Sequence, residues 1–247
     1  VVIDSGSSVI SIAQALLDGG GGGGLTKLGT GTLYLNGANT YTGLTTVSNG
    51  ILGGIGSIAG PVTVVSGATL APGASIGTLA VGGAVTLNAG STNVMELNKT
   101  TGTNDQLVVS GTLTYGGTLV VSNLSGTLAA GDTFKLFQAG SIGGSFNAYS
   151  LPALSAGLGW NVANLSSGLI SVVPTASTNL LWNLSGTNLT LSWPADYTGW
   201  RLQIQTNPVG TGLGANWVDV PGSTATNNLA LPVDTTMGNV FYRLIYP

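Results

Sequence analysis

Short alternations of apolar and polar residues fill most of this chain. Between residues 25 and 173, runs of three to six residues alternate leucine, valine or isoleucine with threonine or serine, as in TLYL, VTVV and TLVV. Successive side chains of a strand point to opposite faces, so Leu33 and Leu35 would share one face and Thr32 and Tyr34 the other. Gly-containing and Asn-Gly pairs separate the runs at spacings of roughly 8–12 residues, as turns do. The pattern predicts an all-β chain.

Two architectures fit strands of this kind. A sandwich or barrel would join antiparallel strands by hairpins, whereas a β-solenoid would wind every strand in the same direction with a turn after each. We expect the solenoid, because the strands are short and uniform and because VSNGIL, VSGATL and VSGTLTYGGTL repeat a Val-Ser step before a turn and a following leucine. Stacked coils would align like residues into ladders, in which threonine and asparagine side chains satisfy one another.

The pattern changes at residues 172–179. The tryptophans of the chain are Trp160, Trp182, Trp193, Trp200 and Trp217, so all but the first follow this change. Short antiparallel strands around these rings predict a small antiparallel β-sandwich of immunoglobulin or fibronectin type III character. We therefore expect three parts: residues 1–24 as an N-terminal strand with a glycine-rich link, residues 25–173 as the solenoid, and residues 174–247 as the sandwich.

Composition excludes several classes of function. Only 5% of the 247 residues are charged, yet 43% are hydrophobic, which is too many for a disordered chain. The chain has no cysteine and no histidine, so the commonest metal ligands and the commonest general base are missing. Five basic residues are too few for a nucleic-acid-binding stripe, and no apolar run approaches the roughly 20 residues of a membrane-spanning helix. We expect no metal and no cofactor, and a stability that is flat between roughly pH 6 and 8.

Six consecutive glycines at residues 19–24 meet the dinucleotide-binding spacing trivially. That motif requires a following helix, and strand-like sequence follows here instead. The phosphate-loop spacing from Gly24 to Gly29 places Thr30 where a lysine is needed. Calcium-binding roll repeats need an aspartate in every copy, and only Asp18 lies near the run. We interpret the glycines as a flexible link or a tight crossing of the chain.

The acidic residues between residues 25 and 173 are Glu96, Asp105 and Asp132, and we expect each to stand alone. Glu96 with Lys99, and Asp132 with Lys135, are expected to form exposed pairs of small energetic consequence. Enzymes that degrade polysaccharides need clustered carboxylates. We therefore expect no catalytic residue, and a polysaccharide-degrading β-helix enzyme is the second alternative to the function given below.

Residues 25–52 resemble one copy of the autotransporter-associated β-strand repeat, a passenger-associated repeat. The matching positions are Leu25, Thr26, Lys27, Gly29, Gly31, Thr32, Leu33, Leu35, Gly37, Asn39, Tyr41, Gly43, Thr45, Val47, Gly50 and Leu52. The resemblance implies a right-handed parallel β-helix that is secreted, to or beyond the bacterial cell surface. Residues 53–173 resemble, more loosely, the passenger region that follows such repeats. Autotransporters end in a long membrane barrel, and residues 174–247 do not resemble one, so the similarity is to a passenger type without that barrel.

The expected function is structural. The chain begins with VVID and SVISIA, which indicate strands already under way, without a polar cap and with a segment upstream. We expect copies to join there, end to end or by strand addition, as building blocks of an extracellular filament or surface layer. The predicted inter-subunit residues are Val1, Val2, Ile3, Val9, Ile10 and Ile12. The alternative is a monomeric cell-surface adhesin or glycan-binding passenger.

Aromatic side chains are the candidate glycan-binding residues. Exposed rings stack on sugars, and Tyr197 and Trp200 flank a predicted turn, so these two are the predicted stacking residues. Trp182, Trp193 and Trp217 are expected to fill the core of the sandwich instead.

Overall fold

The computed structural model describes residues 1–175, 179–234 and 236–245. The described chain is almost entirely strand and turn, with three short 3-10 helices. It divides into two compact units. The first comprises Val1–Leu128, Thr133–Leu154 and Trp160–Ser171, and the second comprises Ala129–Asp132, Ser155–Gly159 and Val172–Pro247. Among the described residues, no helix has the length and hydrophobicity needed to cross a membrane.

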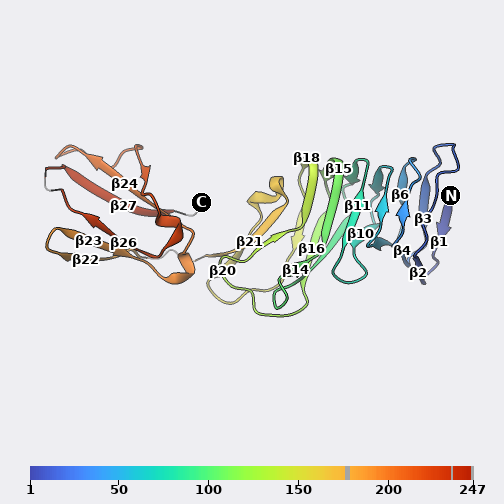
Figure 1. Ribbon diagram of the computed structural model, residues 1–247, viewed down its shortest axis with the longest axis horizontal. Helices are drawn as coiled ribbons and strands as arrows, with labels where there is room; N and C mark the ends of the chain where they lie inside the picture. The colour runs from blue at the N-terminus through green and yellow to red at the C-terminus, as the bar shows by residue number, and fades with distance from the viewer. Residues whose placement is uncertain (176–178, 235, 246–247) are drawn as a thin grey trace. The chain divides into compact units, whose positions relative to one another are not determined.

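Parallel strands build the first unit, stacked one beside the next along its length (Figure 1). One sheet contains, in spatial order, β1 (Val2–Asp4), β3 (Leu25–Leu28), β6 (Thr45–Val47), β9 (Val62–Val64), β12 (Val85–Leu87), β15 (Gln106–Tyr115), β11 (Thr78–Val81), β8 (Ser57–Ile58) and β5 (Ala38–Asn39), with β18 (Phe137–Gly144) also paired to β15. The other contains β19 (Ala148–Ser150), β16 (Thr118–Asn123), β13 (Thr92–Asn98), β10 (Thr69–Pro72), β7 (Ile51–Gly54), β4 (Thr32–Leu35) and β2 (Val9–Ile12), with β14 (Thr103–Asn104) antiparallel to β13.

The long strand β15 belongs to two rows of strands. Its first half, Gln106 to Val109, pairs with β11, and its second half, at Leu113 and Thr114, pairs with β12. Three rows of parallel strands therefore run along the unit, and each coil of the chain contributes short strands to these rows. This is the arrangement of a β-solenoid, as the sequence predicted.

Successive coils pair in register, so like residues stack in columns. In the second sheet Ile10 pairs with Leu33, Leu33 with Leu52, and Leu52 with Leu70. Leu33, Leu52 and Leu70 are each 0% exposed and line the interior. Leu35 is also buried, whereas Thr32 and Tyr34 are half-buried on the opposite face, which confirms the predicted alternation.

The segment before residue 25 contributes a coil of its own. β1 pairs with β3, and β2 pairs with β4, both in parallel. Glycine allows the backbones of these neighbouring coils to approach closely. A Cβ atom on Gly31 would lie 2.0 Å from the carbonyl oxygen of Ser8, which no larger residue could occupy without moving the coil.

Aromatic side chains of the last coils pack together and contact the segment that follows these coils. The rings of Tyr115 and Phe146 stack with centroids 4.5 Å apart, and Tyr115 also contacts Phe137 edge to face. The Tyr115 hydroxyl donates a hydrogen bond of 3.0 Å to the carbonyl of Leu165, within the 3-10 helix η1 (Ala163–Ser167). A three-stranded sheet of β17 (Thr133–Lys135), β21 (Leu169–Pro174) and β20 (Leu158–Asn161) completes this part of the chain.

The second unit contains two three-stranded antiparallel sheets. One has the order β22 (Leu181–Ser185), β23 (Asn188–Ser192), β26 (Asn228–Pro232), and the other has the order β25 (Val218–Asp219), β24 (Arg201–Asn207), β27 (Asn239–Ile245). Two short 3-10 helices, η2 (Ala195–Tyr197) and η3 (Ser223–Ala225), lie between strands. Leu191 from the first sheet, Trp193 directly after β23, and Leu202 from the second sheet meet in one buried cluster.

The tryptophans of this unit differ in position. Trp193 is 2% exposed and fills the core, as expected. Trp182 is 72% exposed, so its assignment to the core is wrong. The ring of Trp217 is half-buried, and the guanidinium of Arg243 lies 4.3 Å from its centre. Periodicity places Trp182 on the correct face of its strand, but it cannot tell whether another sheet covers that face.

Candidate functional site

The first candidate site is a buried lysine in the coil that resembles the passenger repeat. Lys27 points inward from β3 and is 0% exposed. Its ammonium donates to the carbonyls of Leu28 at 2.7 Å, Gly29 at 2.8 Å and Asn49 at 3.1 Å. An ammonium has three donors, so all of them are used. Burial lowers the pKa of Lys27, and the nearby carboxylate of Asp4 opposes that change.

These contacts join two consecutive turns. Leu28 ends β3 and Gly29 lies in the turn that follows it, whereas Asn49 lies in the turn that follows β6, one coil further on. The ammonium therefore acts as a fixed link between coils rather than as a solvated surface charge. Sequence reasoning did not identify this role, because a lysine in a short strand gives no sign that it points inward toward backbone carbonyls.

Asn39, which lies in the same repeat as Lys27, links three successive coils. The side chain is 2% exposed, and its oxygen accepts a hydrogen bond of 2.9 Å from the backbone N–H of Leu16 in the preceding coil. Its amide nitrogen donates to the carbonyl of Gly37 at 3.0 Å and to that of Ser57, in the following coil, at 2.9 Å. Near it, the buried hydroxyls of Tyr41 and Thr45 are 2.8 Å apart and hydrogen-bonded. The repeat residues are thus internal connectors.

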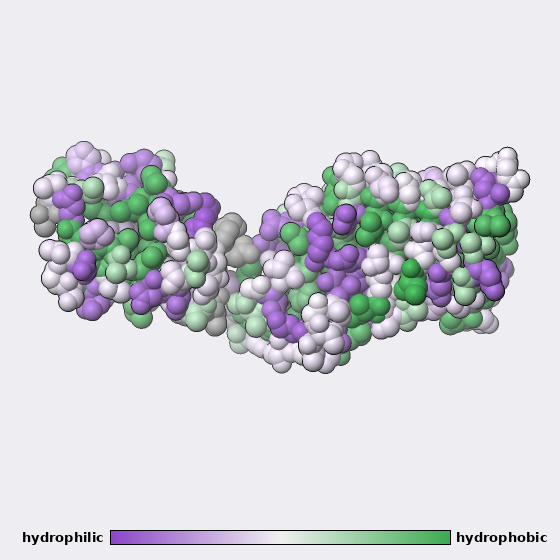
Figure 2. Space-filling view, in the orientation of Figure 1, coloured by the Kyte–Doolittle hydropathy of each residue, from purple (hydrophilic) through white to green (hydrophobic). Residues whose placement is uncertain are grey.

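The predicted inter-subunit residues lie at the edge of the first described coil. Val1, Val2 and Val9 are 80%, 63% and 67% exposed. Ile3, Ile10 and Ile12 are half-buried. β1 and β2 each end their sheet in the described chain, with a strand paired on one side. Figure 2 shows hydrophobic surface at this end of the solenoid.

The predicted glycan-stacking residues contribute to the core of the second unit. Tyr197 is 7% exposed, and its ring meets that of Trp200 edge to face, with centroids 4.9 Å apart. Trp200 is half-buried and packs against the same core cluster. Sugar stacking on these two rings stays a prediction.

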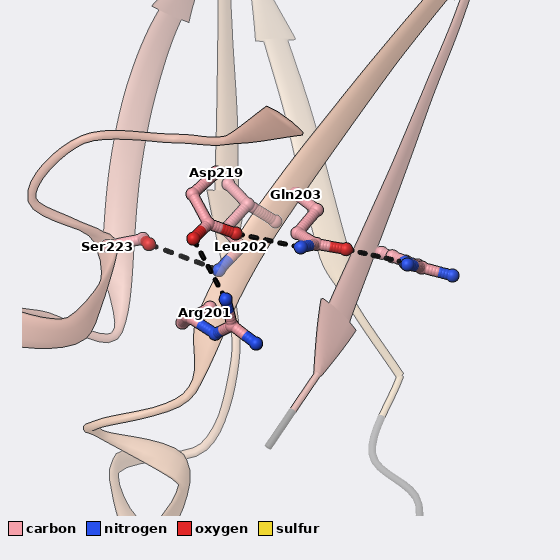
Figure 3. Close-up of polar contacts among 6 residues, drawn as sticks. Arg201, Leu202, Gln203, Asp219 and Ser223 are labelled. Carbon is pink, nitrogen blue, oxygen red and sulfur yellow. Dashed lines mark hydrogen bonds and ion pairs between the residues drawn. The ribbon is translucent and has the colours of Figure 1, made fainter. Parts of the chain in front are cut away.

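A polar network crosses the sheet of β25, β24 and β27 (Figure 3). Arg201 forms an ion pair of 2.9 Å with Asp219, and the side-chain amide of Gln203 donates to the same carboxylate at 2.7 Å. Arg243 in turn donates from Nε to Gln203 at 2.8 Å and lies over the ring of Trp217. The hydrogen bond from Gln203, together with Arg201, lowers the pKa of Asp219. The side-chain amide of Gln203 on β24 donates to Asp219 on β25 and accepts from Arg243 on β27, so this network joins the three strands to one another.

Asp105 is the buried acidic residue of the solenoid and is 1% exposed. Its two carboxylate oxygens accept backbone N–H groups, from Gly77 at 2.8 Å and from Glu96 at 2.7 Å. Burial raises the pKa of Asp105 to about 6, against the effect of these two hydrogen bonds, and the Glu96 carboxylate adds to the increase. The expectation that Glu96 and Asp105 each stand alone is therefore wrong. The contacts of Asp105 are those of an anchor between strands.

The comparisons with known proteins agree with this geometry. Residues 25–53 match the passenger-associated-transport-repeat family. A stretch of 51 residues is also 45% identical to the adhesin BmaC autotransporter of Brucella suis biovar 1 (strain 1330). That match covers 21% of this chain and 2% of the adhesin, so the chain spans a small fraction of that protein.

The match to this family confirms the resemblance that the sequence of residues 25–52 indicated. It also confirms the predicted location, because both comparisons indicate a protein that is secreted or exposed at the cell surface. Lys27, Asn39, Tyr41 and Thr45 all lie within the repeat, so its signature positions include the links between coils described above.

Replacing Lys27 by methionine should destabilise the repeat. Methionine keeps a long unbranched side chain but leaves the three carbonyls around the ammonium without their donor. We expect the free energy of unfolding to fall by about 2–4 kcal/mol, measured by urea denaturation. Lys135→Met is the matched control, because Lys135 is exposed and donates to the carbonyl of Ser167 from the surface. Equal losses for both variants would contradict the role of Lys27.

The stability of the chain should depend on pH through Asp105. Its pKa of about 6 in the folded state lies above the ordinary value near 4, so the folded state binds this proton more tightly than the unfolded state does. The free energy of unfolding should therefore fall as the pH rises from about 4 to about 6, and then level off. Thermal melting across pH 4–8 measures this slope, and Asp105→Asn should remove it. A slope that is unchanged in the variant would assign the titration to another group.

Proposed function

We propose that this chain is part of the passenger of a surface adhesin, in which the solenoid is a stiff, non-enzymatic stalk. The observation that carries the proposal is the repeat coil, bonded in register to the coil before it and the coil after it. Lys27 and Asn39 satisfy their buried polar groups with carbonyls and N–H groups of neighbouring coils. Bending or separating the coils would expose these groups, so the stack resists both.

Two further features support a structural role. The buried carboxylate of Asp105 is occupied by two backbone N–H groups, which leaves it poorly placed to act on a substrate. The relative to which a stretch of 51 residues is 45% identical is named an adhesin. We also propose that the second unit is a β-sandwich of immunoglobulin or fibronectin type III character and that the solenoid is right-handed. The shared core of the two antiparallel sheets supports the first of these.

Adhesion by the purified chain tests this function. Beads coated with the protein should bind to some members of a panel of cell surfaces, matrix proteins and immobilised glycans, whereas beads coated with albumin should not. Incubation with soluble polysaccharides should release no new reducing ends. Beads that bind nothing would contradict an adhesin, and release of reducing ends that disappears in Asp105→Asn would indicate the polysaccharide-degrading alternative.

Self-association at the first coil is the second candidate function. The exposure of Val2 and Val9, on strands that end both sheets in the described chain, favours it. Parallel strands with a free edge can accept a further coil, and a copy of the chain can supply one. Copies joined in this way would build an extracellular filament rather than a single stalk.

Electron microscopy of the negatively stained protein tests the filament. We expect fibres that lengthen with protein concentration, and we expect Val2→Lys combined with Val9→Lys to abolish them by placing charges at the joint. The double variant should keep the melting temperature of the parent chain, since both valines are more than half exposed. Single particles at every concentration of the parent chain would exclude the filament and leave the stalk proposal unaffected.

A further inference from the structure

Strand β22 carries large apolar side chains on the face that forms the core elsewhere in its sheet. In the antiparallel register, Trp182 lies opposite Leu191 and Leu184 lies opposite Leu189. Directly opposite residues of neighbouring strands point to the same face of a sheet. Leu191 is 4% exposed and belongs to the core, and Leu189 packs against that core. Trp182 and Leu184 therefore extend two core rows onto β22.

No described side chain covers this extension. Trp182 is 72% exposed and Leu184 is 52% exposed. In the described chain, strands β23, β24, β26 and β27 all contribute side chains to the core cluster, whereas β22 contributes none. The opposite sheet thus covers β23 and β26 but leaves the inner face of β22 in solvent.

Among the described residues, no strand pairs with the outer backbone edge of β22. β22 is the terminal strand of its sheet, and all five of its residues are exposed. Exposed edges of natural sheets usually carry lysine, proline or a bulge, which prevent pairing with another strand. The sequence from Asn179 to Gly186 is NLLWNLSG and contains neither a charge nor a proline. A free edge beside an uncovered apolar row fits an extended strand with apolar residues at alternate positions.

We propose that this strand is β22 of a second copy of the chain, paired antiparallel about a two-fold axis at Asn183. In this register Trp182 of one copy lies opposite Leu184 of the other, so apolar side chains meet on the same face. The axis at Asn183 pairs all five residues of β22, whereas an axis at Trp182 would pair three. The absence of charge on the strand means that two copies approach without like-charge repulsion. This pairing is independent of the joint at the first coil and of the adhesin function.

Cysteine cross-linking tests the register directly, because the chain contains no cysteine. Residues opposite each other in an antiparallel pair have Cα atoms about 4.5–5.5 Å apart, which a disulfide can span. Asn183→Cys should therefore give a disulfide-linked dimer under mild oxidation, even in dilute protein. Val209→Cys is the control, because Val209 lies outside β22 in the same unit and is 84% exposed. Equal cross-linking of both variants would reflect random collision and overturn the proposal.

Light scattering on the double variant Val2→Lys with Val9→Lys, which removes the filament joint, provides a second measurement. The mass should approach twice that of one chain as the concentration rises, and Trp182→Lys or Leu184→Lys should weaken the association at least tenfold. Circular dichroism should show that these exposed substitutions leave the fold intact, and Val209→Lys should keep the dimer. Because the double variant lacks the joint at the first coil, its mass reports the pairing at β22 separately from the filament. A mass of one chain at every concentration would overturn the pairing.

Discussion

The in-register hydrogen bonding between successive coils is the constraint on which the rest of the solenoid depends. It stacks Leu33 on Leu52 and Leu52 on Leu70, and so closes the aliphatic interior. It also brings carbonyls from neighbouring turns to the ammonium of Lys27. A single coil could provide neither the column nor the complete set of acceptors. Each coil is therefore stable only between its neighbours, which is the general behaviour of repeat architectures.

The two units satisfy their polar groups in different ways. In the solenoid, Lys27, Asn39 and Asp105 are almost fully buried, and backbone groups are their partners. In the second unit, Arg201 and Asp219 form their ion pair at the surface, where such pairs contribute little to stability. Only 5% of the residues are charged, and backbone groups take the place of charged partners where the polar side chains are most deeply buried.

The sequence predicted which side chains stack inside the solenoid better than it predicted the polar contacts between coils. The alternation around Leu33 and Leu35 determines which side chains are buried, because the two faces of a strand are fixed by its geometry. The partners of Asp105 could not be predicted, since they depend on pairing between segments. The winding of the coils brings Gly77 close from 28 residues away, and the antiparallel pairing of β14 with β13 brings Glu96 close from 9 residues away. Trp182 shows the same limit, because its exposure depends on how far the opposite sheet extends and not on its own strand.

The pairing of each strand with a strand of the next coil gives the solenoid a natural structural unit, the complete coil. Thr26 pairs with Val2 on one side and with Thr46 on the other, and Thr46 pairs in turn with Thr63. Each strand thus meets an equivalent strand about one coil before it and one coil after it. Removal of one complete coil would present the flanking coils with partners of the same kind, whereas removal of half a coil would turn buried leucines toward water. Such a protein can lengthen or shorten over evolution in whole coils while its interior stays unchanged.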